Sequence, residues 1–253
     1  MYRKKGFTLI ELLVVISIIA LLLSILTPAL QQVKEQAKKT ICRSNQRQIY
    51  IGSMEYSQSN NEVLLMGYQW DTKQYNYVVW DGGYVVWGPL YEGEYIESQK
   101  SWHCPAYKNN WSEVTEVWPP EDLISGKIDP ADVLEFAAVS TYGSRPDIEW
   151  IITPEGKWEP EKNIKWADIS SRKAYISDWC SDSFVFSRGH EGGLNVLSLD
   201  GHAEWLSIDE SRTFESFGGK ELSLEEILEM MDGPWGPWFN DDMDRIWEIF
   251  DNN

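Results

Sequence analysis

Apolar residues fill positions 7–26 of the sequence almost without interruption, and Glu11 is the one charged residue among them. A helix of this length spans roughly 30 Å, which is the thickness of the hydrocarbon core of a bilayer. Arg3, Lys4 and Lys5 precede the apolar run, and no comparable basic cluster follows it closely. The positive-inside rule therefore predicts a transmembrane helix with a cytoplasmic N-terminus and an extracytoplasmic remainder.

A secretory signal peptide would also begin with basic residues and an apolar run, but its apolar core is shorter and a small-x-small cleavage site follows it. The segment Ser24-Ile-Leu-Thr-Pro28 offers no convincing site of this kind. We therefore expect residues 7–28 to stay attached to the chain as a membrane helix.

Glu11 is the unusual residue of this helix, because a charged carboxylate at membrane depth costs several kcal/mol and is functional by default. Position 7 is Phe and position 15 is Val, so no basic side chain lies one helical turn away in the sequence. If the chain were cut after Gly6, the new amine of Phe7 would be a cation that could pair with Glu11 of a neighbouring copy. The simpler alternative is a carboxylate that reaches the interface of a plain membrane anchor.

The sequence KKGFTLIELLVVISIIALL closely resembles the N-terminal signature of type IV pilins and type II secretion pseudopilins. The resemblance implies that a prepilin peptidase cuts between Gly6 and Phe7, that Phe7 is then N-methylated, and that Glu11 is needed for assembly. Pro28 lies where this family often has a helix-kinking proline, and a proline inside a helix removes one ladder hydrogen bond. The implied partners are the peptidase, an inner-membrane assembly platform with its ATPase, other pilin-like subunits, and membrane lipid before assembly.

Apolar residues recur at three- and four-residue spacing after Pro28, at Leu30, Val33, Ala37 and Ile41. This spacing predicts an amphipathic helix over residues 29–57, whose apolar stripe packs on a globular domain. The segment SNNEV that follows is expected to end the helix.

The stretch 58–217 combines short β-rich runs with turn residues and predicts a globular head. Two similar runs, residues 77–80 and 84–87, flank Asp81-Gly82-Gly83 and predict a hairpin. The segment AYISDW, residues 174–179, is typical of a short buried strand. With the N-terminal helix, these patterns and the pilin resemblance predict an α+β fold in which a long helix packs on an antiparallel sheet.

A second hairpin is expected within RGHEGGLNVLSLDGHAEWLSI. Residues 194–199 form its first strand, Asp200-Gly201 a two-residue type I′ turn, and His202 begins the returning strand. The spacing from His190 to Asp200-Gly201 resembles a bacterial pilin-like family named for this H-X9-DG pattern. The segments CRSNQRQI, WHCPA, STYGSRP and AYISDW resemble the same family in the same order, although Gln46 and Cys180 depart from it.

His190, Asp200, His202 and Asp178 are residue types that bind zinc. A straight strand over residues 194–199 has ends roughly 20 Å apart, which places His190 and Asp200 at opposite ends of the hairpin. We therefore expect structural roles for these residues, with no metal site. The sequence also lacks a Gly-x-Ser-x-Gly motif, a Cys–His nucleophile pattern and a phosphate loop, so no enzymatic activity is expected.

The formal net charge of −18 over 253 residues becomes more negative if the basic leader, residues 1–6, is removed. This charge argues against binding to nucleic acid, whose phosphates need a positive surface. Cys42, Cys104 and Cys180 would face an oxidising compartment, where an odd number leaves at least one cysteine unpaired. Cys42 and Cys104 lie in segments that resemble the family, and this favours a bridge between them, with Cys104–Cys180 as the alternative.

The tail, residues 218–253, is acidic and aromatic, and Ser223 and Glu226 have the spacing of a capping box at the start of a helix. Four tail residues match the first, third, fifth and twelfth positions of a calcium-binding loop: Asn240, Asp242, Asp244 and Asp251. Arg245 stands at the sixth position, where that loop needs Gly. No cofactor is therefore expected, and calcium remains an analogy with pseudopilins that bind it in a C-terminal loop.

These observations predict a structural subunit, either a pilin or a pseudopilin, of a type IV pilus or a type II secretion-like filament. It would be a single-pass inner-membrane protein that later forms part of a periplasmic or extracellular filament. The alternative is a membrane-anchored glycan-binding or adhesive protein that uses the pilin start only for export. The 14 Trp residues keep that alternative open, since exposed aromatic rings stack on sugars. An anchored metallohydrolase ranks third.

Overall fold

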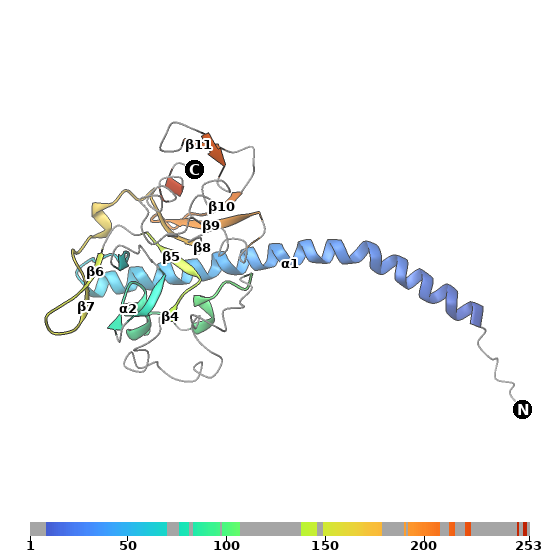
Figure 1. The fold of residues 1–253 in the computed structure, drawn as a ribbon, viewed down its shortest axis with the longest axis horizontal. Helices are drawn as coiled ribbons and strands as arrows, with labels where there is room; N and C mark the ends of the chain where they lie inside the picture. Colours follow the sequence, from blue (N-terminus) through green and yellow to red (C-terminus); the bar gives the residue numbers. More distant parts are fainter. Residues whose placement is uncertain are drawn as a thin grey trace, which may run out of the picture. The chain divides into compact units, whose positions relative to one another are not determined.

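The computed structural model describes residues 9–69, 76–80, 83–96, 98–106, 138–145, 149–178, 190, 192–207, 213–215, 221–223, 247, 250 and 251. The chain divides into two compact units, residues 1–38 and residues 39–253. One long helix, α1 (Leu9–Ser59), contributes residues to both units (Figure 1).

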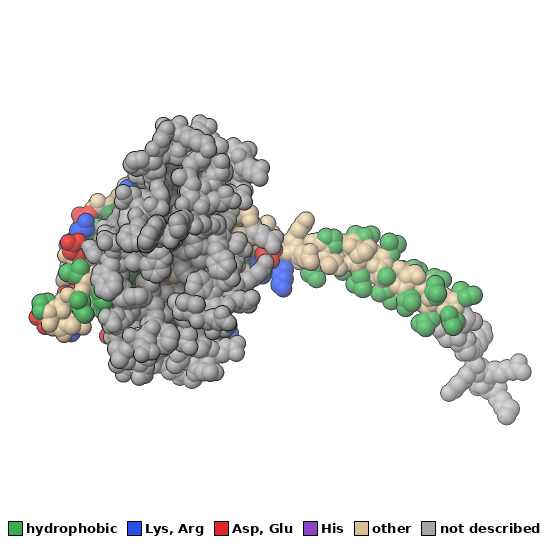
Figure 2. Space-filling model, in the orientation of Figure 1, with side chains coloured by type: hydrophobic (Ala, Val, Ile, Leu, Met, Phe, Trp, Pro, Cys, Tyr) green, Lys and Arg blue, Asp and Glu red, His purple; other side chains and the backbone are tan. Residues whose placement is uncertain are grey.

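In the first unit, α1 is strongly apolar. Its most apolar 18-residue window has a mean hydropathy of 3.0 and is not buried at all, and α1 is the one helix among the described residues that is long and apolar enough to cross a membrane. Figure 2 shows hydrophobic side chains along this part of the helix. The hydroxyls of Ser17, Ser24 and Thr27 donate to carbonyl oxygens one turn earlier, at 2.7–2.8 Å. These polar groups are therefore satisfied within the helix, as a bilayer requires.

In the second unit, the face of α1 that packs into the head is polar. Its buried residues are Cys42, Asn45, Gln46, Ile49, Gly52, Ser53 and Ser57. Of the apolar stripe predicted to pack on the head, Ile41 lies in this unit and is exposed, while Leu30, Val33 and Ala37 belong to the first unit. The prediction was wrong for Ile41, because the buried face is stabilised by hydrogen bonds to the head, which a search for apolar periodicity does not detect. The helix ends at Ser59, and Asn61 and Glu62 then take positive φ angles of 55° and 64°.

The described residues of the head form four small sheets. The central one is antiparallel, with the order β10 (Ala203–Ser207), β9 (Gly193–Ser198), β8 (Ala174–Asp178) and β5 (Tyr142–Ser144). Every residue of β8 and β9 is buried. This confirms the buried strand expected in AYISDW.

The other three sheets are smaller. They contain β3 (Gly83–Tyr84), β2 (Tyr77–Trp80) and β4 (Ala138–Val139); β1 (Tyr68–Gln69), β6 (Glu149–Ile152) and β7 (Trp158–Pro160); and β11 (Thr213–Glu215) with β12 (Glu221–Ser223). The β1–β6 ladder is parallel and the remaining ladders are antiparallel. Three short helical segments complete the described elements: α2 (Gly88–Glu92), η2 (Gln99–Trp102) and η5 (Trp166–Asp168). A long N-terminal helix followed by an antiparallel sheet is the α+β, pilin-like layout that the sequence predicted.

The first predicted hairpin is present but shorter than expected. Val79 lies opposite Tyr84 and Trp80 opposite Gly83, while the turn residues 81 and 82 lie outside the described residues. The second run leaves the sheet after Tyr84, since Val86 has a φ of +48° and Trp87 is the N-cap of α2. Pro at the start of a helix favours this change of direction. The ring of Trp87 is fully buried and donates to the carbonyl oxygen of Tyr142 at 2.9 Å.

The second predicted hairpin, β9–β10, has a three-residue loop. The amide of Ser198 donates to the carbonyl oxygen of His202 at 2.8 Å, and the amide of Gly201 donates to that of Ser198 at 2.9 Å. Gly201 has a φ of +81°, whereas Asp200 is not among the residues with positive φ. The predicted type I′ turn was therefore wrong, because such a turn needs positive φ at both central residues. A Cβ at position 201 would also lie 3.3 Å from the ring of Tyr50.

Candidate functional site

Glu11 lies in the first described turn of α1 and is exposed. Gly6 and Phe7, the predicted cleavage and methylation residues, lie outside the described residues. Pro28 is inside α1, which continues through it to Ser59. The described structure therefore places the predicted assembly carboxylate on a long, exposed, apolar helix.

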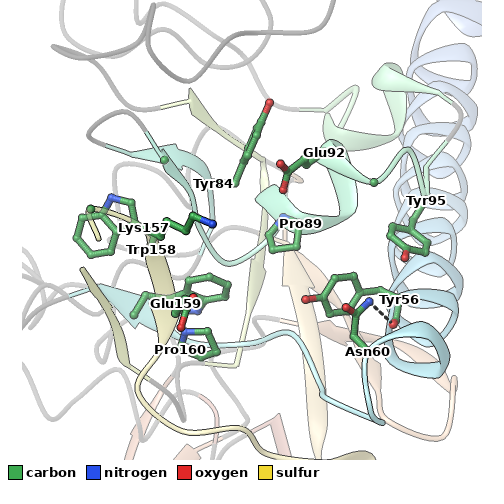
Figure 3. A pocket seen from close by; sticks show the side chains of 14 residues that line it. Tyr56, Asn60, Tyr84, Pro89, Glu92, Tyr95, Lys157, Trp158, Glu159 and Pro160 are labelled. Atoms are coloured by element: carbon green, nitrogen blue, oxygen red, sulfur yellow. Dashed lines mark hydrogen bonds between the residues drawn. The ribbon is translucent and has the colours of Figure 1, made fainter. Parts of the chain in front are cut away.

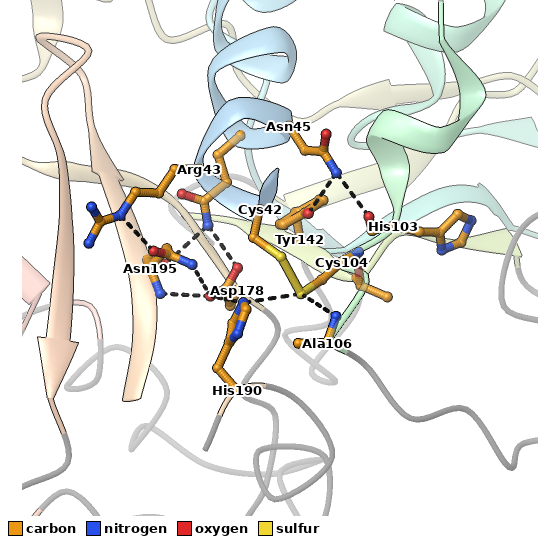
Figure 4. A network of polar contacts seen from close by, with 12 residues as sticks. Cys42, Arg43, Asn45, His103, Cys104, Ala106, Tyr142, Asp178, His190 and Asn195 are labelled. Carbon is orange, nitrogen blue, oxygen red and sulfur yellow. Dashed lines mark hydrogen bonds and ion pairs between the residues drawn. A yellow bond between two sulfur atoms is a disulfide. The ribbon is translucent and has the colours of Figure 1, made fainter. Parts of the chain in front are cut away.

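A second candidate site is a buried cluster where α1 meets the central sheet (Figure 4). Cys42 of α1 and Cys104, which follows η2, form a disulfide with a Cα–Cα distance of 5.2 Å. This is the pairing that the family resemblance favoured, and Cys180 lies outside the described residues. The bridge joins α1 to a segment 62 residues later in the chain.

His190 and Asp178 lie beside this disulfide. Nε2 of His190 is 3.2 Å from Sγ of Cys104 and 3.8 Å from Oδ2 of Asp178. The rings of His190 and Trp205 also pack edge to face, with centroids 5.6 Å apart. The side chain of His190 is fully buried, so the imidazole, the carboxylate and the disulfide share one small enclosed space.

Amide groups hold the carboxylate of Asp178 in place. Its Oδ2 accepts hydrogen bonds from the backbone and side-chain amides of Asn195 at 2.6 and 2.9 Å, and its Oδ1 accepts one from Nε2 of Gln46 at 3.0 Å. Nε of Arg43 donates to Oδ1 of Asn195 at 2.9 Å. Burial raises the pKa of Asp178 to about 7, while these hydrogen bonds and the charge of Arg43 act in the opposite direction.

Four residues were possible zinc ligands by residue type, and the structure separates them into two pairs. His190 and Asp178 lie in the cluster at the start of β9, while Asp200 and His202 lie at the other end of that strand. The amide of His202 donates to Oδ1 of Asp200 at 2.8 Å, which is a local turn contact. Strand β9 thus lies between His190 and Asp200 and keeps them apart.

Sequence reasoning missed the role of the polar residues on α1. Besides Gln46, Asn45 donates through Nδ2 to the carbonyl oxygen of His103 at 2.9 Å and to the hydroxyl of Tyr142 at 3.1 Å. Tyr50 donates to the carbonyl oxygen of Leu199 at 2.9 Å. The one signal in the sequence was the departure at Gln46 from the residues common in the family.

An open pocket of about 710 Å³ lies elsewhere on the head (Figure 3). Its lining combines the aromatic residues Tyr56, Tyr84, Tyr95, Trp150 and Trp158 with Asn60, Glu92, Lys157 and Glu159. Aromatic rings beside carboxylates and an amide are suited to binding a sugar, which presents both an apolar face and hydroxyl groups.

Asp251, the last residue of the calcium-loop pattern, makes structural contacts in the head. Oδ1 of Asp251 accepts hydrogen bonds from Nη1 of Arg145 at 2.9 Å and from the amide of Ala174 at 2.8 Å. Asn240, Asp242 and Asp244 lie outside the described residues, as does the predicted tail helix after Ser223. Trp247, Phe250 and Asp251 have helical backbone conformation.

The fold defines the class of protein as α+β with a pilin-like layout. Residues 1–27 match the family model of the prokaryotic N-terminal methylation motif. This match supports a pilin-type signal and points to a structural, membrane-anchored protein that a prepilin peptidase processes. Neither the comparison with curated proteins nor that with solved structures found a match.

Proposed function

We propose that this protein is a filament subunit, a pilin or pseudopilin, of a type IV pilus or type II secretion-like system. In this proposal residues 1–6 are a leader that the peptidase removes, residues 7–28 form the membrane and assembly helix, and residues 58–217 form the extracytoplasmic head. The main supporting observation is the methylation motif over residues 1–27, on a helix whose apolar window is entirely exposed.

Glu11 gives this helix a way to recognise another copy. An exposed apolar helix can leave lipid for the core of a filament at little cost, since both surroundings are apolar. A carboxylate in the same helix is costly in either place unless a cation neutralises it. The methylated amine of Phe7 on an adjacent subunit supplies such a cation, and this pair also fixes the axial register between the two helices.

The proposal is tested with Glu11→Val in cells that contain the prepilin peptidase and the assembly machinery. The variant keeps the apolar length, so cleavage and membrane content should stay at the wild-type level. The amount of the protein in sheared filaments should fall at least tenfold, and Glu11→Asp should be intermediate because its side chain is shorter. Immunoblots of the membrane and filament fractions measure both quantities.

Ser17→Val is the matched control, because it also replaces a polar residue of the exposed helix with Val. The hydroxyl of Ser17 donates only one turn back, to Leu13, at 2.8 Å, so its loss should leave assembly unchanged. Wild-type assembly of Glu11→Val, or equal loss in both variants, would contradict the role assigned to Glu11.

The aromatic pocket supports a second candidate, a glycan-binding head that the pilin-type helix exports and anchors. A glycan array with the full chain in detergent tests it, together with Tyr84→Ala and the control Tyr50→Phe, which lies outside the pocket. Glycan binding that Tyr84→Ala abolishes and Tyr50→Phe leaves intact would support this candidate, and absence of binding would remove it.

A further inference from the structure

The buried cluster around the Cys42–Cys104 bridge contains more polar side chains than a disulfide needs around it. The ligand atoms of Cys42, Cys104, Asp178 and His190 all lie within 4.8 Å of one another, and all four residues are buried. A disulfide is uncharged and packs among apolar groups without help. Hydrogen bonds from Asn195 and Gln46 offset part of the cost of burying the Asp178 carboxylate, and buried charged groups in proteins are generally either paired or bound to a metal.

The four side chains form a ligand set that zinc prefers. Thiolate sulfur, imidazole nitrogen and carboxylate oxygen bind Zn²⁺ at about 2.0–2.3 Å in tetrahedral geometry. Two sulfurs bound in this way lie roughly 3.7 Å apart, so the bonded sulfurs of Cys42 and Cys104 would need to separate by less than about 2 Å. Rotation of the two side chains can supply this movement, since the Cα atoms are 5.2 Å apart.

Neighbouring groups already orient these side chains as the outer contacts of a metal site do. Asn195 and Gln46 fix the carboxylate of Asp178 through three hydrogen bonds. The amide of Ala106 donates to Sγ of Cys104 at 3.4 Å, which is a contact that also stabilises a metal-bound thiolate. The ring of Trp205 fixes that of His190.

We propose that Cys42, Cys104, His190 and Asp178 bind one zinc ion when the disulfide is reduced, so that zinc binding and disulfide formation exclude each other. A dithiol reductant breaks the S–S bond by supplying two electrons and two protons, and is itself oxidised to a disulfide. Zn²⁺ then replaces the protons of the two thiols, which pass to solvent, and His190 binds through its nearer nitrogen, Nε2. This inference concerns the head alone and does not depend on filament assembly.

The test uses the full chain in detergent with Cys180→Ser, so that Cys42 and Cys104 are the only cysteines. The reduced chain should bind one Co²⁺, with the visible bands of tetrahedral cobalt and a sulfur-to-cobalt charge-transfer band, and Zn²⁺ should displace the cobalt. The oxidised chain should show neither band. A reduced chain without these bands, or equal metal binding by the oxidised chain, overturns the proposal.

His190→Ala and His202→Ala, in the same background, identify the nitrogen ligand. His202 is exposed at the turn of the β9–β10 hairpin and serves as the matched control. Zinc affinity should fall at least about tenfold for His190→Ala and stay unchanged for His202→Ala. Equal affinities in the two folded variants contradict the proposed ligand set. If His190→Ala does not fold, as judged by circular dichroism, the cobalt spectrum of the unaltered cluster decides the proposal by itself.

Discussion

Arg145 and Asp251 form an ion pair in which Nη1 lies 2.9 Å from Oδ1, with side chains that are 6% and 15% exposed. The same carboxylate accepts a hydrogen bond from the amide of Ala174, the first residue of β8, at 2.8 Å. Asp251 therefore joins the end of the described chain to the central sheet. Loss of one member of a buried pair leaves the other charge without its partner, which is more costly than loss of both.

We expect Asp251→Asn to lower the free energy of unfolding by about 2 kcal/mol, because a buried charge-assisted hydrogen bond is lost. Lys165→Met is the control, since Lys165 pairs with Glu62 at 3.4 Å on the surface, where both side chains are largely exposed. That change should cost less than about 0.5 kcal/mol. Urea unfolding of the full chain, followed by Trp fluorescence, measures both values. Equal effects would mean that the Arg145–Asp251 pair does not stabilise the head.

Processing should depend on the size and charge of residue 6. Gly6→Ala should still be cleaved in part, whereas Gly6→Glu should block cleavage, because a bulky charged side chain does not fit where the family has Gly. Mass spectrometry of the wild-type chain should find N-methyl-Phe7 at the mature N-terminus. A wild-type N-terminus at Met1, in cells with an active prepilin peptidase, would contradict this prediction.

The Cys42–Cys104 disulfide should be a major source of stability in the head. A bridge that spans 62 residues restricts the unfolded chain by about 4 kcal/mol in the chain-entropy model. Cys42→Ser with Cys104→Ser should therefore unfold at much lower urea concentration, while Cys180→Ser should behave like the wild type. Non-reducing peptide mapping should recover the Cys42–Cys104 linked peptide. Three free thiols, or a Cys104–Cys180 peptide, would show a different pairing.

His103 should lower the free energy of unfolding of the head at acidic pH. Burial lowers the pKa of its imidazole from 6.5 to about 4, so the folded protein keeps the ring neutral while the unfolded chain takes up a proton. The unfolded state therefore binds more protons between pH 6.5 and 4, and stability from this residue is lost as the pH falls through that window. Across this pH window, His103 lowers the free energy of unfolding by about 3 kcal/mol at most.

His103→Leu should remove this contribution. The difference in unfolding free energy between the variant and the wild type is the quantity to follow, because Asp178 has a raised pKa and changes stability in the opposite direction over part of the same range. The variant should gain relative stability as the pH drops from 6.5 to 4. A difference that stays constant with pH would contradict the lowered pKa of His103.

The sequence alone determined the long N-terminal helix, its apolar part and the strands β8, β9 and β10. Each depends on local properties: the length of an apolar run, the helical periodicity that continues beyond Pro28 as far as SNNEV, and runs of β-branched and aromatic residues between turns. The methylation motif is also local, since all its residues lie within the first 27 positions. Such features need no knowledge of distant segments.

The tertiary structure decided which face of α1 is buried and which residues meet there. Gln46 and Asn45 are polar, and their burial is favourable only because Asp178, Tyr142 and the backbone of His103 supply hydrogen-bond partners from far along the chain. Apolar periodicity favoured burial of the stripe that ends at Ile41 over burial of the polar face, yet Ile41 is 48% exposed.

The two ends of the β9–β10 hairpin also make contacts with segments that are distant in the sequence. Local sequence located the hairpin, and only the tertiary structure shows that Gly201 lies against the ring of Tyr50 from α1. At the other end, His190 joins Asp178 and the disulfide because strand pairing brings β8 beside β9 and the bridge holds Cys104 against α1. Residue types could be read from the sequence, whereas their proximity depends on strand pairing between β8 and β9 and on a bridge between residues 62 positions apart.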